Sequence, residues 1–125
     1  MSDGKRVLVV DDDDYWRERT TAMVIACGHS PITATGSREA EDLLDSESFD
    51  LIITDNSMET YDAGFDLLAR EWYLNREIPS ILCSSATLTR ELEEKLKQFP
   101  HVTYVEKSVS RENLELLATI RRLLP

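Results

Sequence analysis

Five short apolar runs divide the sequence, and residues that could do chemistry stand close behind four of them. Asp11 to Asp14 follow the first run, and Asp55 follows the third. Ser84 follows the fourth run, and Lys107 comes two positions after the fifth. Clustered carboxylates are costly unless a cation neutralises them, and Mg²⁺ suits them because it prefers oxygen ligands and keeps waters that a phosphate can displace. A hydroxyl and an ammonium beside that metal would complete a clamp for a phosphoryl group.

Asp55 stands alone after its run, which makes it the natural nucleophile, with Asp11 and Asp12 as metal ligands. Carboxylates form acyl phosphates in enzymes that work through an aspartyl-phosphate intermediate. Each residue alone also has an ordinary explanation, because aspartates favour helix N-termini and lone polar residues are common in turns and at strand ends. Four such groups, each behind a different apolar run, favour the chemical interpretation.

The apolar runs have the length and composition of strands that are buried on both faces of a sheet. The sequence predicts strands at residues 7–10, 31–34, 49–54, 80–83 and 102–105.

Helical patterns fill the segments between the runs. The first covers 15–26, with Trp16, Met23 and Ala26 on its inner face and Gly28 as a left-handed C-cap. The second begins at Ser37 as a cap and the third at Gly64. The fourth spans 88–99, and the last follows a cap at Ser110, with an apolar stripe of Leu114, Leu117, Ile120 and Leu124.

Strict alternation of strand and helix predicts a (βα)₅ fold with a parallel sheet between two layers of helices. In such open sheets, ligands bind beyond the carboxyl ends of the strands. The four chemical groups should therefore converge on one edge of the sheet.

Composition predicts one folded domain over residues 1–125, with a core from about 6 to 124. The chain is 42% hydrophobic and 30% charged, and its 24 acidic residues against 14 basic ones give a formal charge of −10. That balance argues against nucleic acid or an anionic membrane as the main partner. No apolar stretch approaches the roughly 20 residues of a membrane span, and we interpret Cys27 and Cys83 as reduced core thiols of a cytoplasmic protein.

The ordered motifs resemble the receiver domain of bacterial two-component response regulators, over nearly the whole chain from Arg6 to about Leu124. The resemblance rests on Val-Leu-Val-Val-Asp-Asp-Asp at 7–13, Phe-Asp-Leu-Ile-Ile-Thr-Asp at 49–55, Ile-Pro-Ser-Ile-Leu-Cys-Ser at 78–84 and Tyr-Val-Glu-Lys at 104–107. It implies a flavodoxin-like sheet of strand order 2-1-3-4-5.

The resemblance also implies roles for single residues. Asp55 would accept phosphate from a sensor histidine kinase or a histidine phosphotransfer protein. Mg²⁺ would be held by Asp11, Asp12, Asp55 and the backbone carbonyl of Ser57, with Asp12 the more direct ligand of the acid pair.

Phosphorylation in this family shifts an existing equilibrium. The resemblance implies that Lys107 and Ser84 hold the phosphoryl oxygens, and that Ser84 and Tyr104 move inward together. The readout face is formed by the fourth helix, the fifth strand and the fifth helix. It would meet a downstream protein or an output domain, or form a homodimer on phosphorylation. The domain would be a switch with weak self-catalysis rather than an enzyme.

The sequence departs from the family pattern at three positions. Glu59 stands where a proline is usual, four residues after the acceptor, and adds a negative charge near the site. The same loop is about one residue longer before Gly64. Ser108 follows the lysine in place of a proline that is often cis, and a cis bond before a non-proline residue costs about 3 kcal/mol.

Two other functions could use some of these residues. A haloacid dehalogenase-type phosphatase could use Asp11, Asp13, Ser84 and Lys107, but no matching fingerprint follows Asp13 and no Gly-Asp-x-x-x-Asp motif occurs late in the chain. A receiver-like interaction module that is never phosphorylated typically loses the acceptor, the acid pair or the lysine, and this chain retains all of them. An EF-hand loop is excluded because the aspartates lack its alternate spacing, glycine and final glutamate.

Overall fold

The computed structural model describes residues 4–107 and 113–125, and within them strands and helices alternate along the chain. The strands are β1 (Arg6–Val10), β2 (Ser30–Ala34), β3 (Leu51–Asp55), β4 (Ser80–Ser84) and β5 (Val102–Glu106). The helices are α1 (Asp14–Ala26), α2 (Ser37–Ser46), α3 (Ala63–Tyr73), α4 (Arg90–Leu96) and α5 (Leu114–Leu123).

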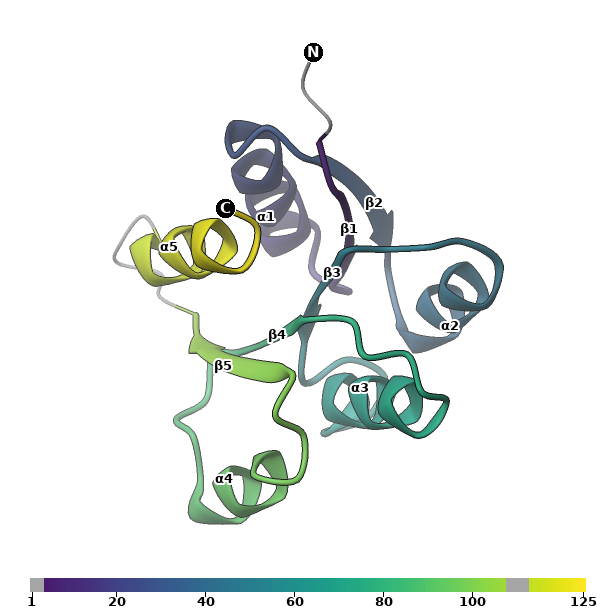
Figure 1. The fold of residues 1–125 in the computed structure, drawn as a ribbon. Helices are drawn as coiled ribbons and strands as arrows, with labels where there is room; N and C mark the ends of the chain where they lie inside the picture. The colour runs from purple at the N-terminus through teal and green to yellow at the C-terminus, as the bar shows by residue number, and fades with distance from the viewer. Residues whose placement is uncertain (1–3, 108–112) are drawn as a thin grey trace.

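All described strand pairs are parallel, and the sheet order is β2-β1-β3-β4-β5. Figure 1 shows α1 and α5 on one face of this sheet and α2, α3 and α4 on the other. The predicted (βα)₅ flavodoxin-like sandwich, with its strand order, is therefore confirmed.

The central strands bury side chains on both faces of the sheet. Successive side chains of a strand point to opposite faces, so the buried residues form two cores. One core lies under α1 and α5 and the other under α2, α3 and α4. Each fully buried Val, Leu or Ile contributes roughly 1.5–3 kcal/mol of transfer free energy. The first core includes Val7, Val9, Leu51, Ile53, Ile81 and Ile120, and the second includes Leu8, Val10, Ile52, Leu67, Leu68 and Leu82.

Parallel pairing brings the chemical residues to the same edge of the sheet. Asp55, the last residue of β3, lies opposite Cys83 of β4, and Ser84 lies opposite Glu106 of β5. Lys107 follows Glu106 directly. The convergence predicted from the strand ends is thus a consequence of sheet register.

The inner face of α1 differs from the prediction. Thr20 and Val24 are the buried residues of this helix, Met23 is partly buried, and Ala26 is exposed. With Trp16 the buried positions form a stripe four residues apart, as one helix face requires. Apolar side chains are spread around this helix, so their pattern did not fix which face turns inward.

The stripe of α5 is also shifted. Ile120 and Leu124 are buried as predicted, but Leu114 is 61% exposed and Leu117 only partly buried, while Leu116 faces the core. Several leucines stand close together at the start of this helix, so two stripes were compatible with the sequence.

Helix ends agree with the prediction only in part. Gly28, just past α1, has a φ of +85° and confirms the left-handed C-cap. The N-cap of α2 is Gly36, so Ser37 is the first helical residue and not the cap. The N-cap of α5 is Asn113, and the predicted cap at Ser110 lies outside the described residues.

The fourth helix is shorter than its apolar spacing predicted. Thr89 is its N-cap and accepts a hydrogen bond from the backbone N–H of Leu92 at 3.1 Å, and the helix ends at Leu96. Leu88 and Phe99 continue the spacing but lie outside the helix. In the part of the chain that is described, no helix is both long and apolar enough to cross a bilayer.

Candidate functional site

Three carboxylates meet at the carboxyl edge of the sheet. Asp11, Asp12 and Asp55 each offer an oxygen, and these oxygens lie within 4.8 Å of one another. Asp11 is 4% exposed and Asp55 is 9% exposed, whereas Asp12 faces solvent. Three anions at this separation repel one another unless a cation offsets their charge, so the cluster is a candidate cation site.

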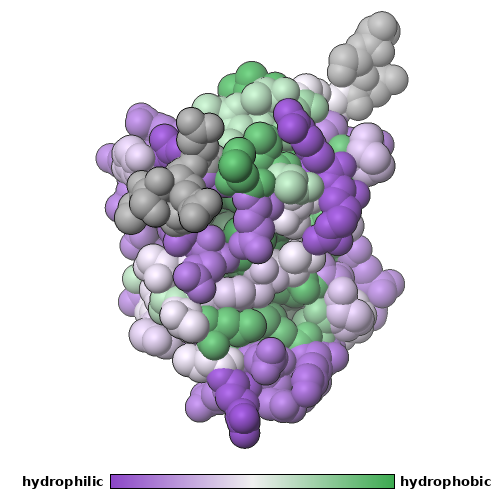
Figure 2. Space-filling view, turned by 90° about the vertical axis from the view of Figure 1, so that its left-hand side faces the viewer, coloured by the Kyte–Doolittle hydropathy of each residue, from purple (hydrophilic) through white to green (hydrophobic). Residues whose placement is uncertain are grey.

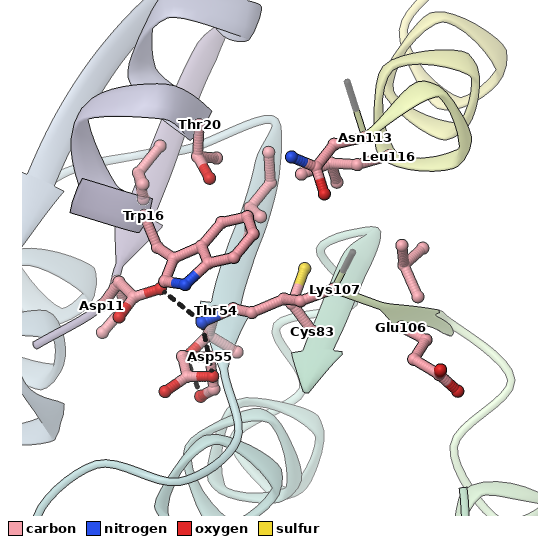
Figure 3. Close-up of a pocket in the computed structure, with 14 residues that line it drawn as sticks. Asp11, Trp16, Thr20, Thr54, Asp55, Cys83, Glu106, Lys107, Asn113 and Leu116 are labelled. Carbon is pink, nitrogen blue, oxygen red and sulfur yellow. Dashed lines mark hydrogen bonds and ion pairs between the residues drawn. The ribbon is translucent and has the colours of Figure 1, made fainter. Parts of the chain in front are cut away.

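Lys107 supplies one positive charge to the cluster. Its Nζ lies 2.9 Å from Oδ2 of Asp11 and 2.9 Å from Oδ1 of Asp55, and Figure 3 shows the ammonium between the two carboxylates. Burial alone would lower the pKa of Lys107, but the hydrogen bonds to the two carboxylates outweigh burial and raise it. The lysine is therefore held in its charged form.

The surroundings of Asp55 disfavour the ionised form of its carboxyl. Burial raises the pKa of its carboxyl, the hydrogen bond from Lys107 lowers it, and the charges of Asp11 and Asp12 raise it further, with a net increase. A carboxylate that is costly to ionise in the protein is the one that gains most from an added cation.

Trp16 covers the lysine. Lys107 Nζ lies 5.2 Å from the centroid of the indole ring, within the range of a cation–π contact, and Figure 3 shows the ring beside the ammonium. The sequence placed Trp16 on the apolar face of a helix and gave no sign of this second contact.

The four-aspartate run serves two purposes. Asp11 Oδ1 accepts the backbone N–H of Asp13 at 2.9 Å. The Asp13 carboxylate caps α1 by accepting the N–H of Trp16 at 3.1 Å, and Asp14 pairs with Arg17. The first two aspartates therefore belong to the carboxylate cluster and the last two to the start of the helix. The helix-start interpretation is confirmed for Asp13 and Asp14, and the metal-ligand role of Asp11 and Asp12 stays a prediction.

Ser84 and Tyr104 meet at the loop after β4. Ser84 Oγ accepts the backbone N–H of Ala86 at 3.1 Å, and the Tyr104 hydroxyl donates to the Ala86 carbonyl at 2.7 Å. Both residues line a groove of about 230 Å³ next to the carboxylates, together with Ser57. The predicted residues thus form two adjoining groups, one of charges and one of hydroxyls.

Two residues beside Asp55 fix the start of α3. Asn56 is buried, its Oδ1 accepts the N–H of Phe65 at 3.0 Å, and its Nδ2 donates to Asp62 at 3.2 Å. Gly64 packs so closely that a Cβ there would lie 2.0 Å from the Asp55 carbonyl oxygen. The helix begins one residue earlier than predicted, at Ala63. Asn56 was missed, although a polar residue directly behind a buried strand was a usable signal.

Cys83 lies directly under the site. It is buried, and burial raises the pKa of its thiol to about 12, so it stays protonated at neutral pH. Cys27 is partly buried, and both cysteines are free thiols. Among the described residues no peptide bond is cis, and Ser108, with its bond to Lys107, lies outside them.

A family model for the response regulator receiver domain matches residues 7–119. The chain therefore belongs to the response regulator receiver domain family, as its motifs had suggested. Domains of this family are signalling switches rather than conventional enzymes.

Individual relatives agree with this assignment. A two-component response regulator of Arabidopsis thaliana, ARR11, is 31% identical over 118 residues, which cover 91% of this chain and 22% of the relative. The chain spans no more than about a fifth of the length of the curated relatives it matches.

Solved structures share the fold. The receiver domain of an HD domain-containing protein from Pseudomonas fluorescens Pf-5 has a TM-score of 0.82 at 24% identity, covering 97% of this chain and 94% of that one. The response regulator TrrA of Thermotoga maritima, crystallised in complex with Mg²⁺-BeF, has a TM-score of 0.76 at 25% identity, covering 95% and 98%.

Proposed function

We propose that this domain is a phosphoacceptor switch in which Asp55 takes a phosphoryl group from a phosphohistidine. The donor would be a sensor histidine kinase or a histidine phosphotransfer protein. The observation that carries the proposal is the contact of Lys107 with both Asp55 and Asp11 inside a three-carboxylate cluster.

The proposed reaction moves a phosphoryl group from a histidine nitrogen to a carboxylate oxygen. A carboxylate oxygen of Asp55 forms a bond to phosphorus, the phosphorus–nitrogen bond of the donor breaks, and the imidazole nitrogen takes up a proton. Lys107 is placed to stay with one oxygen of Asp55 and to neutralise charge that develops on the phosphoryl oxygens. Small phosphodonors could react in the same way, which is the weak self-catalysis expected of such a switch.

The donors at the site fit Mg²⁺. Asp11, Asp12 and Asp55 are oxygen ligands, and the exposed Asp12 leaves one side open for water and phosphate, as Mg²⁺ prefers. The backbone carbonyl of Ser57 would be a fourth protein ligand. When bound, the ion would supply the positive charge that offsets the carboxylates and the phosphoryl group. The complex of TrrA with Mg²⁺-BeF supports this assignment by similarity.

The contacts of Ala86 suggest how the signal leaves the site. If Ser84 Oγ turns toward a phosphoryl oxygen, it gives up the N–H of Ala86, and Tyr104 holds the carbonyl of the same residue. The loop between β4 and α4 would then move, and the α4-β5-α5 face with it. That face would bind a downstream protein or an output domain, or form a homodimer on phosphorylation.

The character of that face supports a protein partner. Figure 2 shows apolar patches beside strongly hydrophilic ones on this side of the molecule, with a hydrophilic end where α4 lies. A formal charge of −10 makes direct nucleic acid or anionic membrane binding unfavourable. We further propose that residues 1–125 act as one receiver domain, with a core at about 6–124, in the cytoplasm, where free thiols such as Cys27 and Cys83 stay reduced.

The test is the intact mass of the protein after incubation with Mg²⁺ and acetyl phosphate, for wild type and Asp55→Asn. We expect wild type to gain one phosphoryl group, the gain to disappear with EDTA, and Asp55→Asn to gain none. Labelling of Asp55→Asn at the wild-type level would refute the acceptor assignment. A folded wild type that gains nothing would instead favour the interaction module that works without phosphorylation.

A further inference from the structure

Glu59 lies in the loop after β3, and its carboxylate reaches the N-terminus of α2. The backbone N–H of Ser37 donates to Oε1 of Glu59 at 3.2 Å and to Oε2 at 3.3 Å. Ser37 is the first residue of α2, so Glu59 satisfies an N–H that the helix itself leaves without a partner. A carboxylate also suits this position because the N-terminal end of a helix dipole is positive.

Gly36 makes room for this contact. As the N-cap of α2 it has no side chain to cap the helix, and a Cβ there would lie 2.9 Å from Oε2 of Glu59. Glu39, in the first turn, accepts the N–H of Thr35 at 2.7 Å. The start of α2 therefore depends on two glutamates, one of its own and one from the loop behind Asp55.

The loop that carries Glu59 is closed on itself. The Ser57 hydroxyl donates to the Tyr61 carbonyl at 2.9 Å, and the N–H of Met58 donates to the Thr60 carbonyl at 3.1 Å. Glu59 is two residues from Ser57, whose carbonyl is the proposed metal ligand. Restraint of Glu59 by α2 is thus transmitted over a short, hydrogen-bonded turn.

The contact also directs the charge of Glu59. Its side chain lines an open groove with Gly36 and Ser37, whereas Asp11 and Asp55 line a different cavity. The negative charge that the sequence placed near the site is therefore engaged by a helix N-terminus on the α2 side.

We propose that Glu59 is a positioning residue for the cation site, which holds the Ser57 turn in place and links that site to the N-terminus of α2. The inference rests on the proposed function, because it assumes that the carboxylate cluster takes Mg²⁺. Linkage between two sites is reciprocal. Cation binding should therefore slow hydrogen exchange at Ser37, and loss of Glu59 should weaken cation binding.

The experiment uses the whole chain and MgCl₂ alone. Mg²⁺ affinity is measured by calorimetry, and exchange of the Ser37 amide is measured by NMR with and without Mg²⁺. We expect Glu59→Ala to weaken Mg²⁺ binding by about threefold to tenfold, less than the loss of a group that contacts a ligand directly. Glu59→Gln retains an acceptor and should lose less. In wild type, Mg²⁺ should slow exchange at Ser37, and in Glu59→Ala it should not.

A second variant separates positioning from simple helix capping. Gly36→Asp, combined with Glu59→Ala, gives α2 a cap of its own and keeps the net charge of wild type. The backbone at position 36 is extended, with φ −173° and ψ 177°, and such a backbone accepts any residue. We expect this double variant to regain the stability of α2 while its Mg²⁺ affinity remains as low as that of Glu59→Ala.

Two results would overturn the inference. One is an unchanged Mg²⁺ affinity in Glu59→Ala, and the other is full recovery of affinity in the double variant, which would make Glu59 a cap only. In both cases normal phosphorylation of wild type leaves the proposed function standing. A wild type that neither binds Mg²⁺ nor gains a phosphoryl group removes the proposed function and the role of Glu59 together.

Discussion

At the scale of single residues, Lys107 joins two carboxylates of the site. Its ammonium bonds Asp11 and Asp55 at 2.9 Å each and so holds together two carboxylates that would otherwise repel. A cation entering the cluster must share these carboxylates with the lysine. Under the proposed function, the lysine would compete with Mg²⁺ in the resting protein and hold the phosphoryl group after phosphorylation.

Lys107→Ala should make these two effects visible separately. We expect the variant to stay folded, to bind Mg²⁺ about threefold or more tightly because a competing positive charge is gone, and to lose most of its response to phosphorylation. Calorimetry with MgCl₂ measures the first effect, and the change in NMR spectrum on phosphorylation measures the second. Lys97→Ala removes a lysine from an exposed pair with Glu94 and should change neither.

An undiminished phosphorylation-dependent shift in Lys107→Ala would contradict the role of the lysine. Weaker Mg²⁺ binding would show that the ammonium helps to assemble the carboxylates rather than competing for them.

Site residues at strand ends are predictable from the sequence, whereas residues that join the site through tertiary contacts are not. Asp11, Asp55 and Lys107 stand at the carboxyl ends of parallel strands, so strand pairing brings them together. The spacing of Trp16 predicts a residue on the inner face of α1, and nothing in that spacing indicates a lysine beside its ring. Ala86 contacts Ser84 and Tyr104 through its backbone N–H and carbonyl, and a side-chain pattern cannot reveal backbone contacts.

Among the elements, β3 and α3 meet in close backbone contact beside Asp55. Gly64 donates its N–H to the Asn56 carbonyl at 2.9 Å, and its Cα faces the backbone of Asp55 at close range. A Cβ at Gly64 would lie 2.0 Å from the Asp55 carbonyl oxygen and 2.8 Å from the Asn56 Cα. Backbone atoms cannot turn aside as a flexible side chain can.

Gly64→Ala should therefore displace α3 from the end of β3. We expect a loss of about 1–3 kcal/mol in the free energy of unfolding, the usual cost of overpacking, and slower phosphorylation by acetyl phosphate. Urea unfolding and intact mass measure the two effects. Gly28→Ala is the contrasting control, because its φ of +85° is strained for alanine but no atom lies within 4 Å. It should lose roughly 1–2 kcal/mol and phosphorylate normally.

A Gly64→Ala protein with wild-type stability would show that the junction can relax.

Element boundaries are only partly predictable from the sequence. Apolar spacing located every helix in the described residues. It could not choose between the stripes of α5, because neighbouring leucines satisfy more than one helical face. It also could not show that α4 ends at Leu96, because Phe99 continues the same spacing.

At the scale of the whole molecule, the fold is predictable from the apolar runs and from the helical spacing between them. Buried strands alternating with helices leave few topologies for a chain of this size, and the parallel order was predicted correctly. The charge balance acts on the same scale. With 24 acidic and 14 basic residues, the protein carries a formal charge of −10, and three of its carboxylates lie together at the site. Its stability should therefore depend on pH and Mg²⁺ together.

Asp55→Asn tests that dependence. Burial raises the pKa of Asp55 in the folded state above its ordinary value of 3.8. Between the pKa of the unfolded state and the raised pKa of the folded state, the folded state binds more protons. Stability therefore falls as pH rises through this range. At pH 7 and without metal, Asp55→Asn should therefore be more stable than wild type and unfold at a higher temperature.

Calorimetric scans from pH 3 to 8 would follow this difference. The advantage of Asp55→Asn should vanish below about pH 3.8, where Asp55 is protonated in both states. Saturating Mg²⁺ should stabilise wild type more than the variant, because Asp55 offers the ion a full charge and asparagine does not. A variant that is less stable than wild type at pH 7 without metal would mean that Lys107 compensates fully for the burial of Asp55, and the site would then be assembled before any cation arrives.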